Sequence, residues 1–315
     1  MKKITVFLKR NYTYAILALF WAVAALSSQY FRTTNTFSAI FVAAVPIVII
    51  SFSQNAVVLN GGFDLSIGAI ASLSTVICSY LMEISDLAAI AAVMAMGLVV
   101  GLLNGIGITK LKIEPFIMTL GMMYILGGIA QILRPTPGGY ISPGLTRFLL
   151  SSNQPFALVP LLLIIVCCIS GVLFFKKTAF GRRIYAIGGN EKAARMSGVN
   201  VERTRICVYM LSGVVAAIAG VYLACKNTSG NADAGSRYLF DTFTVVFMGG
   251  TLVSGGVGGF SGTVATSLII SSLVYVLQFM NVSSWYQYII KGLLLLLVSG
   301  LQFITLAKRR NGDND

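Results

Sequence analysis

The chain has 315 residues, of which 57% are hydrophobic and only 10% are charged. A soluble domain carries about a quarter charged residues, so this composition excludes a water-soluble globule and makes lipid the expected solvent. The formal net charge is +13, but the basic residues punctuate long apolar runs. That is the membrane pattern and not the pattern of a nucleic-acid-binding protein, so no nucleic acid is expected as a partner.

Apolar segments of near-spanning length recur along the whole chain. They predict an all-α, polytopic membrane protein with about ten transmembrane helices, joined by short loops into a single domain over residues 1–315. In chain order the segments cover residues 13–31, 38–59, 65–82, 87–109, 116–134, 155–175, 206–225, 238–253, 257–279 and 285–306.

Three of these segments have alternative interpretations. The first follows the basic residues Lys2, Lys3, Lys9 and Arg10 but is too long for a signal peptide, which predicts an uncleaved first helix. Glycines interrupt the pair at 238–253 and 257–279, so a broken or re-entrant element is an alternative to two full crossings there.

The distribution of basic residues predicts the orientation. If ten segments cross, seventeen of the 23 Lys and Arg residues fall on the side of the N-terminus. The other side receives Arg32, Arg134, Arg147, Lys226 and Arg237, and Lys291 lies inside the last segment. This bias predicts that both termini are cytoplasmic, that a loop at about 135–154 faces outward, and that a basic loop at about 176–205 faces the cytoplasm.

Metal and cofactor chemistry is not expected in this chain. It contains no histidine, and its five cysteines lie within apolar runs without a CxxC pair. A zinc site is therefore disfavoured, and no cofactor is expected.

The predicted cytoplasmic loop contains a short helix. Asn190 is a good N-cap and Glu191 suits the first helical turn. Ala193 and Ala194 give the helix a smooth face, and Gly198 can end it. Such a helix suits docking into a groove on a partner, and the alternative is an ordinary basic loop.

Residues 180–199, FGRRIYAIGGNEKAARMSGV, resemble the coupling loop of ABC importer permeases of the ribose-transport type. The resemblance implies that this helix sits in a cleft of a cytoplasmic ATPase subunit, which binds the ATP. Glu191, Ala193, Ala194 and Gly198 match the family pattern. It also implies an extracytoplasmic solute-binding protein, a second permease copy or paralogue, and a bacterial plasma membrane.

Two further segments resemble the same family. Residues 61–69, GGFDLSIGA, match its GGIDLSVG stretch, and the region from Asp241 to Gly292 follows its glycine-rich C-terminal pattern. The chain departs from that pattern at Leu239, where the family commonly has Glu. From the residues alone, Asp64 either caps the turn after Gly61 and Gly62 or borders a solute path.

Polar residues inside the apolar segments are the candidates for a solute path. They share amide, hydroxyl or carboxylate groups that match a polyhydroxy solute, and the alternative for each is helix-to-helix hydrogen bonding. The set is Gln54, Asn55, Asp64, Asn104, Thr119, Tyr124, Gln131, Asp241, Thr244 and Gln278. Lys291 is expected to snorkel or to pair with a carboxylate, for which Asp241 is the candidate.

The predicted function is that of a transport subunit for a sugar, without its own ATPase site. A permease for nucleosides or branched-chain amino acids is the alternative within the same architecture. A secondary transporter with broken helices at the midplane is a third possibility. An integral-membrane enzyme is disfavoured, because intramembrane acids, bases and metal ligands are so few.

Overall fold

Helices form every regular element of residues 12–151 and 154–312, which the computed structural model describes. In chain order they are α2 (Tyr12–Ser27), η1 (Tyr30–Arg32), α3 (Thr34–Leu59), α4 (Ile67–Leu81), α5 (Asp86–Thr109), α6 (Pro115–Leu133), α7 (Pro143–Leu150), α8 (Leu158–Lys177), α9 (Ala179–Gly189), α10 (Glu191–Met196), α11 (Val201–Asn227), α12 (Ser236–Met248), α13 (Phe260–Phe279) and α14 (Ser284–Gly312). The all-α prediction is therefore confirmed. Lys2, Lys3, Lys9 and Arg10 lie outside the described residues.

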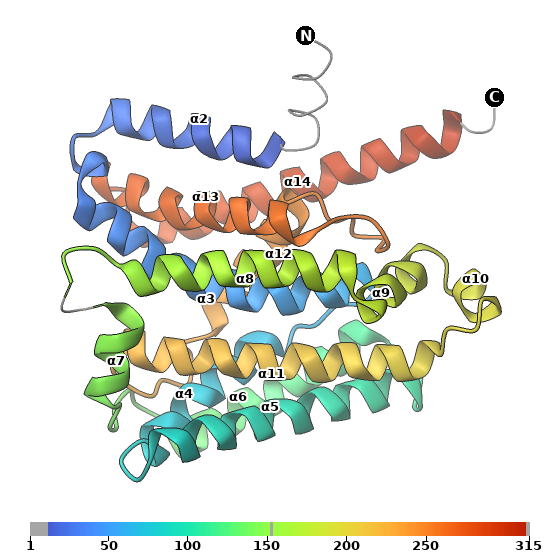
Figure 1. Ribbon diagram of the computed structural model, residues 1–315, viewed down its shortest axis with the longest axis horizontal. Coiled ribbons are helices and arrows are strands. Elements are labelled where there is room, and N and C mark those ends of the chain that lie inside the picture. The colour runs from blue at the N-terminus through green and yellow to red at the C-terminus, as the bar shows by residue number, and fades with distance from the viewer. Residues whose placement is uncertain (1–11, 152–153, 313–315) are drawn as a thin grey trace.

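The long helices lie side by side along one axis, with α7 at one end and α9 and α10 at the other (Figure 1). We call these the α7 end and the α10 end. The segments predicted at about 135–154 and 176–205 lie at the α7 end and the α10 end respectively. Both contain helices that hydropathy does not reveal, namely α7 in the first and α9 in the second.

Each of the ten predicted segments contains a helix, but the described residues give fewer helices of spanning length than the ten expected. Among the described residues, seven helices are long and apolar enough to span a membrane. The exceptions are α2 with 16 residues, α4 with 15 and α12 with 13. A helix rises about 1.5 Å per residue and the hydrocarbon core is roughly 30 Å thick, so α4 and α12 are too short to span it alone, and α2 begins where the described residues begin.

Two of the short helices, α4 and α12, each border a segment in which the chain leaves the helical conformation. Residues 60–66 separate α3 from α4, and residues 249–259 separate α12 from α13. Gly61, Gly255 and Gly256 have positive φ in these segments, a backbone conformation that side chains disfavour. The broken element predicted near residue 250 is confirmed, and a second one precedes α4.

The two unwound segments meet each other and the end of α9. The amide of Gly256 donates to the carbonyl of Leu59 at 3.0 Å. A Cβ on Gly188 would overlap that same Leu59 carbonyl, so α9 can approach so closely only with glycine there. The first unwound segment is largely buried, whereas Ser254 and Val257 of the second are exposed.

The centre of the fold is α11, which packs against α3, α4 and α5. Its contact with α5 uses small residues, since Gly97 and Gly101 face α11 without a side chain between the backbones. Gly105 continues this face against Ile206, whereas Gly107 packs against Met118 of α6. The glycines around Asn104 therefore serve two helix contacts.

Substitution of Gly213 by alanine is expected to destabilise the fold, because its Cβ would overlap the carbonyl oxygen of Gly97 and push α5 from α11. Overpacking of this kind costs about 1–3 kcal/mol, whereas alanine at an open helical position gains up to about 1 kcal/mol over glycine. Gly121→Ala is the matched control, since nothing lies within 4 Å of its Cβ position. Thermal unfolding in detergent should show a lower Tm for Gly213→Ala only. Equal Tm values would contradict the packing argument.

Candidate functional site: a docking surface and a polar cavity at opposite ends

The predicted short helix in the basic loop is α10. The Asn190 side chain accepts from the amide of Ala193 at 3.0 Å, as expected of an N-cap, and Gly198 ends the turn with φ +81°. The helix before it, α9, begins at its own N-cap, where the Thr178 hydroxyl accepts from the amide of Gly181 at 2.9 Å. This threonine, followed by Gly181, Ile184 and Ile187 on one buried face, is the signal that could have revealed α9.

The predicted docking residues divide between two faces of α10. Ala194 is buried against Ile187 and Val201, so it attaches α10 to the rest of the chain. Ala193 and Gly198 are exposed, and nothing lies within 4 Å of a Cβ added at Gly198. Met196, which was not among the predicted residues, is 90% exposed beside them. The free surface of α10 is therefore small, partly apolar and rimmed by basic residues.

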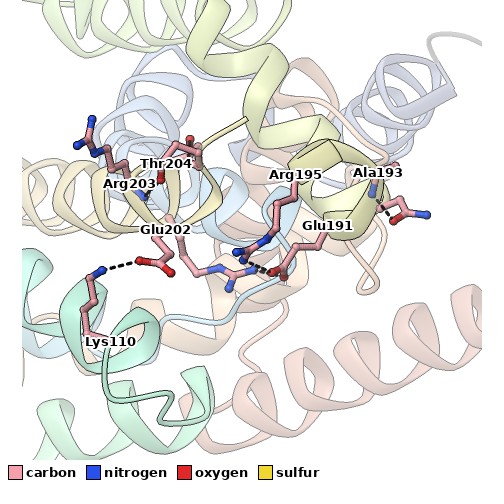
Figure 2. A network of polar contacts seen from close by, with 10 residues as sticks. Lys110, Glu191, Ala193, Arg195, Glu202, Arg203 and Thr204 are labelled. Atoms are coloured by element: carbon pink, nitrogen blue, oxygen red, sulfur yellow. Dashed lines mark hydrogen bonds and ion pairs between the residues drawn. The ribbon is translucent and has the colours of Figure 1, made fainter. Parts of the chain in front are cut away.

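Charged residues hold α10 against its neighbours. The Glu191 carboxylate accepts from Arg205 of α11 at 2.9 Å and from Arg195 at 3.3 Å. The Arg205 hydrogen bond holds the pKa of the Glu191 carboxyl below its ordinary value. Figure 2 shows Glu191 and Arg195 directed toward one another, and Lys110 directed toward Glu202. Glu191 therefore positions α10.

These ion pairs border a cavity of about 540 Å³ at the α10 end. Its lining comes from the turn between α5 and α6, from α10 and from the start of α11, with Gly61 among the lining residues. Tyr185 of α9 also donates to the carbonyl of Gly258 at 3.0 Å. The α9–α10 unit therefore contacts both unwound segments.

Asp64 is one of the predicted path residues that the structure places in the buried protein interior. Its carboxylate accepts from the amide and hydroxyl of Ser66, and from the Ser212 hydroxyl at 2.7 Å. Asn104 donates to the Ser66 hydroxyl at 2.9 Å. The structure thus brings Asp64 and Asn104 together in a network that fixes the turn before α4, as a capping aspartate would.

The remaining predicted path residues are scattered. Thr119 donates to the carbonyl of Pro115 within its own helix, and Gln131 is exposed and donates to Asp233. Asn55 accepts from Thr251 at 2.7 Å, which ties α3 to the second unwound segment. Other members of the set are Tyr124, which is 71% exposed on α6, and Thr244, which donates within α12.

Gln54 differs from the others because it is fully buried and its side-chain amide has no hydrogen-bond partner among the described residues. An unpaired buried amide costs about 1–3 kcal/mol. Gln54 therefore remains a predicted solute contact, since a polar solute could satisfy it.

Asp241 and Gln278 line a polar cavity of about 260 Å³ at the α7 end. The Asp241 carboxylate pairs with the Lys291 ammonium at 2.7 Å, as the sequence predicts. Sequence reasoning missed most of this cavity, which also takes polar side chains from α11, α12, α13 and α14. They are Lys226, Arg237, Tyr238, Ser271, Tyr275, Ser284, Gln287 and Tyr288.

A second cavity of about 590 Å³ lies on the other side of the ion pair. It shares Arg237, Asp241, Tyr288 and Lys291 with the first cavity, but its remaining lining is largely apolar, including Phe240, Leu295 and Leu296. The ion pair therefore stands between a polar cavity and an apolar one. Leu239, where the sequence departs from the family pattern, is 5% exposed in the apolar core.

The structure offers no metal-binding cluster within the residues it describes, where no group of three or more Cys, Asp or Glu side chains is placed to hold an ion. The chemistry available in these regions is instead hydrogen bonding and ion pairing. Two polar regions therefore lie at opposite ends of the helical bundle, and the unwound segments meet at the α10 end.

Comparison with known proteins agrees with this arrangement. Residues 36–299 match the family described as "Branched-chain amino acid transport system / permease component". The chain belongs to this family of importer permeases. Among solved structures, none matches the chain significantly.

The relatives of this permease chain include sugar importers. It is 32% identical over 291 residues to the ribose import permease protein RbsC of Escherichia coli K12, covering 90% of each chain. It is 35% identical to RbsC of Bacillus subtilis, covering 79% of each chain. It is 30% identical to the galactose/methyl galactoside import permease protein MglC of Haemophilus influenzae, covering 96% of each chain.

Proposed function

We propose that the chain is the membrane-spanning permease subunit of an ABC importer that carries a sugar or a sugar-derived solute into the cell. The observation that carries this proposal is the similarity to ribose and galactose import permeases over most of the chain. ATP would be bound and hydrolysed by separate subunits. The protein would lie in the plasma membrane of a bacterium.

The orientation follows from charge. Basic side chains gather at the α10 end, including Lys110 and Lys112 before α6 and Arg182 and Arg183 in α9. By the positive-inside rule this end faces the cytoplasm. In Figure 1, α2 begins and α14 ends toward the side of the α10 end, which supports a common side for both termini. Both termini would therefore be cytoplasmic.

The partners follow from the two ends. An ATPase subunit would dock on the exposed surface of α10, formed by Ala193, Met196 and Gly198. A solute-binding protein would deliver solute at the α7 end, and a second permease, identical or paralogous, would complete the membrane unit.

The coupling mechanism would use the glycine contacts at the α10 end. Movement of the docked α10 would carry α9 with it, since Ala194 and Glu191 fix the two helices to α11 and to each other. Gly188 and Tyr185 of α9 contact the unwound segments before α4 and α13. Shifting these segments would alternate access between the two polar ends.

The test is recovery and energy dependence of the complex. The chain would be co-expressed with its neighbouring gene products, extracted in mild detergent and analysed by mass spectrometry, and the recovered complex would be reconstituted in proteoliposomes. We expect an ATPase subunit to co-purify and solute uptake to require ATP. Uptake that proceeds without ATP and stops when an ion gradient is collapsed would instead identify a secondary transporter.

A branched-chain amino acid is the second candidate solute, because the description of the matching family names it. The two candidates differ in what the solute-binding protein retains. Mass spectrometry of ligand released from the denatured binding protein would distinguish a sugar-derived compound from leucine, isoleucine or valine.

A further inference from the structure

The polar cavity at the α7 end carries an excess of positive charge. Lys226, Arg237 and Lys291 contribute three cations, and Asp241 is the single carboxylate among the described residues that line it. The Asp241–Lys291 pair at 2.7 Å neutralises one cation. Two positive charges therefore remain without a counterion, on the half-buried Lys226 and the exposed Arg237, and together they favour an anion in the cavity.

The other two cations have no acidic partner in the described part of the chain. The Lys226 ammonium donates to the Tyr238 hydroxyl at 3.2 Å, and no carboxylate lies within ion-pair distance of it or of Arg237. Lys226 is half-buried, so its ammonium has replaced part of its hydration with a hydrogen bond to the neutral phenol of Tyr238. Holding a partly buried ammonium this way is costly unless an anion joins it.

A buried polar group in the same cavity also lacks a partner. The Ser271 hydroxyl is 2% exposed, lines the cavity, and has no hydrogen-bond partner among the described residues. Gln278 and Tyr275 lie on the same helix and add amide and phenol groups to the lining. Neutral donors and acceptors of this kind suit the hydroxyl groups of a polyol.

We propose that the solute of this permease is an anionic polyhydroxy compound, whose carboxylate or phosphate binds Lys226 and Arg237 while its hydroxyl groups meet Ser271 and Gln278. The proposal rests on the proposed function and narrows its substrate class from neutral sugars to sugar acids or sugar phosphates. The cavity of about 260 Å³ is near the lower limit of small-molecule sites, which favours a single sugar unit.

The experiment is thermal unfolding of the purified full-length permease in detergent at constant ionic strength. The probes, each at the same millimolar concentration, are D-gluconate, D-ribose 5-phosphate, neutral D-ribose, neutral D-galactose and L-leucine. We expect at least one anionic probe to raise Tm by about 2 °C or more, and neutral D-ribose and D-galactose to raise it by less. Gluconate and ribose 5-phosphate then distinguish a carboxylate from a phosphate.

Arg237→Gln should remove the shift produced by the anionic probe. Arg147→Gln is the matched control, because Arg147 is an exposed arginine of α7 at the same end and does not line the cavity. It should keep the full shift. This contrast would show that the anion binds the arginine in the cavity, because removing an equal charge outside the cavity leaves the Tm shift unchanged.

Several results would overturn the proposal. They are equal shifts with neutral and anionic sugars, a shift with leucine alone, no shift with either anionic probe, or an unchanged shift in Arg237→Gln. A shift with short-chain phosphatidylglycerol and none with the soluble anions would assign the cations to a lipid headgroup instead. None of these results affects recovery of the ATPase subunit, so failure here is distinct from failure of the importer proposal.

Discussion

Replacement of Ala193 by tryptophan is expected to separate the permease from its ATPase subunit while leaving the permease folded. Ala193 lies on the exposed surface of α10 and its side chain makes no contact that the fold needs. A bulky ring there would obstruct a complementary cleft. Truncating or blocking a central interface position costs about 2 kcal/mol or more, which corresponds to roughly 30-fold weaker binding.

The neighbouring residue gives a contrasting result. Ala194→Trp should also reduce ATPase recovery, but through the fold, because Ala194 is 4% exposed against Ile187 and Val201. Its Tm should fall, whereas the Tm of Ala193→Trp should equal that of the wild type. Adjacent alanines thus distinguish a docking surface from the packing that supports it.

The measurement is the amount of ATPase subunit retained after mild detergent extraction, together with the ATPase activity of the retained complex. Ala88→Trp is the control, since Ala88 is an exposed alanine in the first turn of α5 at the opposite end. It should retain a normal amount of the subunit. If Ala193→Trp also did so, α10 would not be the docking helix.

The sequence predicts the positions of the helices well because lipid imposes one dominant requirement. Every backbone group must be paired inside a run of apolar residues, so hydropathy alone locates α5 at 87–109 against an observed Asp86–Thr109. Hydropathy fails for α9, which is an amphipathic helix at the membrane edge. It also fails for α7, where Ser142 before Pro143 is a capping signal inside a loop too polar to register as a span.

The number of full membrane crossings is harder to predict than the positions of the helices. An unwound segment depends on contacts with distant parts of the chain, which a local sequence pattern does not show. Gly61, Gly255 and Gly256 adopt positive φ in the unwound segments, and a Cβ added at Gly255 or Gly256 would overlap the backbone of a distant segment. Glycine in a membrane segment serves equally well for helix packing, as at Gly97 and Gly213. The sequence does not reveal which of these two roles a given glycine has.

The docking helix α10 and the polar cavity at the α7 end also differ in how far the sequence predicts them. The docking helix is local, so Asn190, Glu191 and Gly198 reveal it within ten residues. The polar cavity collects side chains from α3 to α14, and Lys226 and Arg237 each look like an ordinary charge at a helix end. Of its lining, the sequence predicts Gln278 and the Asp241–Lys291 pair, the pair because two ionisable groups deep in apolar segments are each too costly to remain alone.

That pair gives the second large expected effect. Asp241→Asn should destabilise the permease by about 3–5 kcal/mol, because it leaves the Lys291 ammonium without its 2.7 Å partner. The Lys291 side chain is only 18% exposed, so water cannot replace the carboxylate fully. Unfolding by titration with a denaturing detergent, followed by circular dichroism, would measure the loss of stability.

The double variant Asp241→Asn with Lys291→Met tests the cause. Removing both charges leaves no unpaired ion, and replacing a buried pair by groups of similar size is often neutral. We therefore expect most of the lost stability to return, whereas Asp233→Asn, at an exposed residue whose carboxylate accepts from Gln131, should change little. If the double variant were as unstable as Asp241→Asn, the cost would come from the lost aspartate itself and not from the stranded lysine. In that case the stability of the region between the polar and apolar cavities would depend on the Asp241 carboxylate and not on its pairing with Lys291.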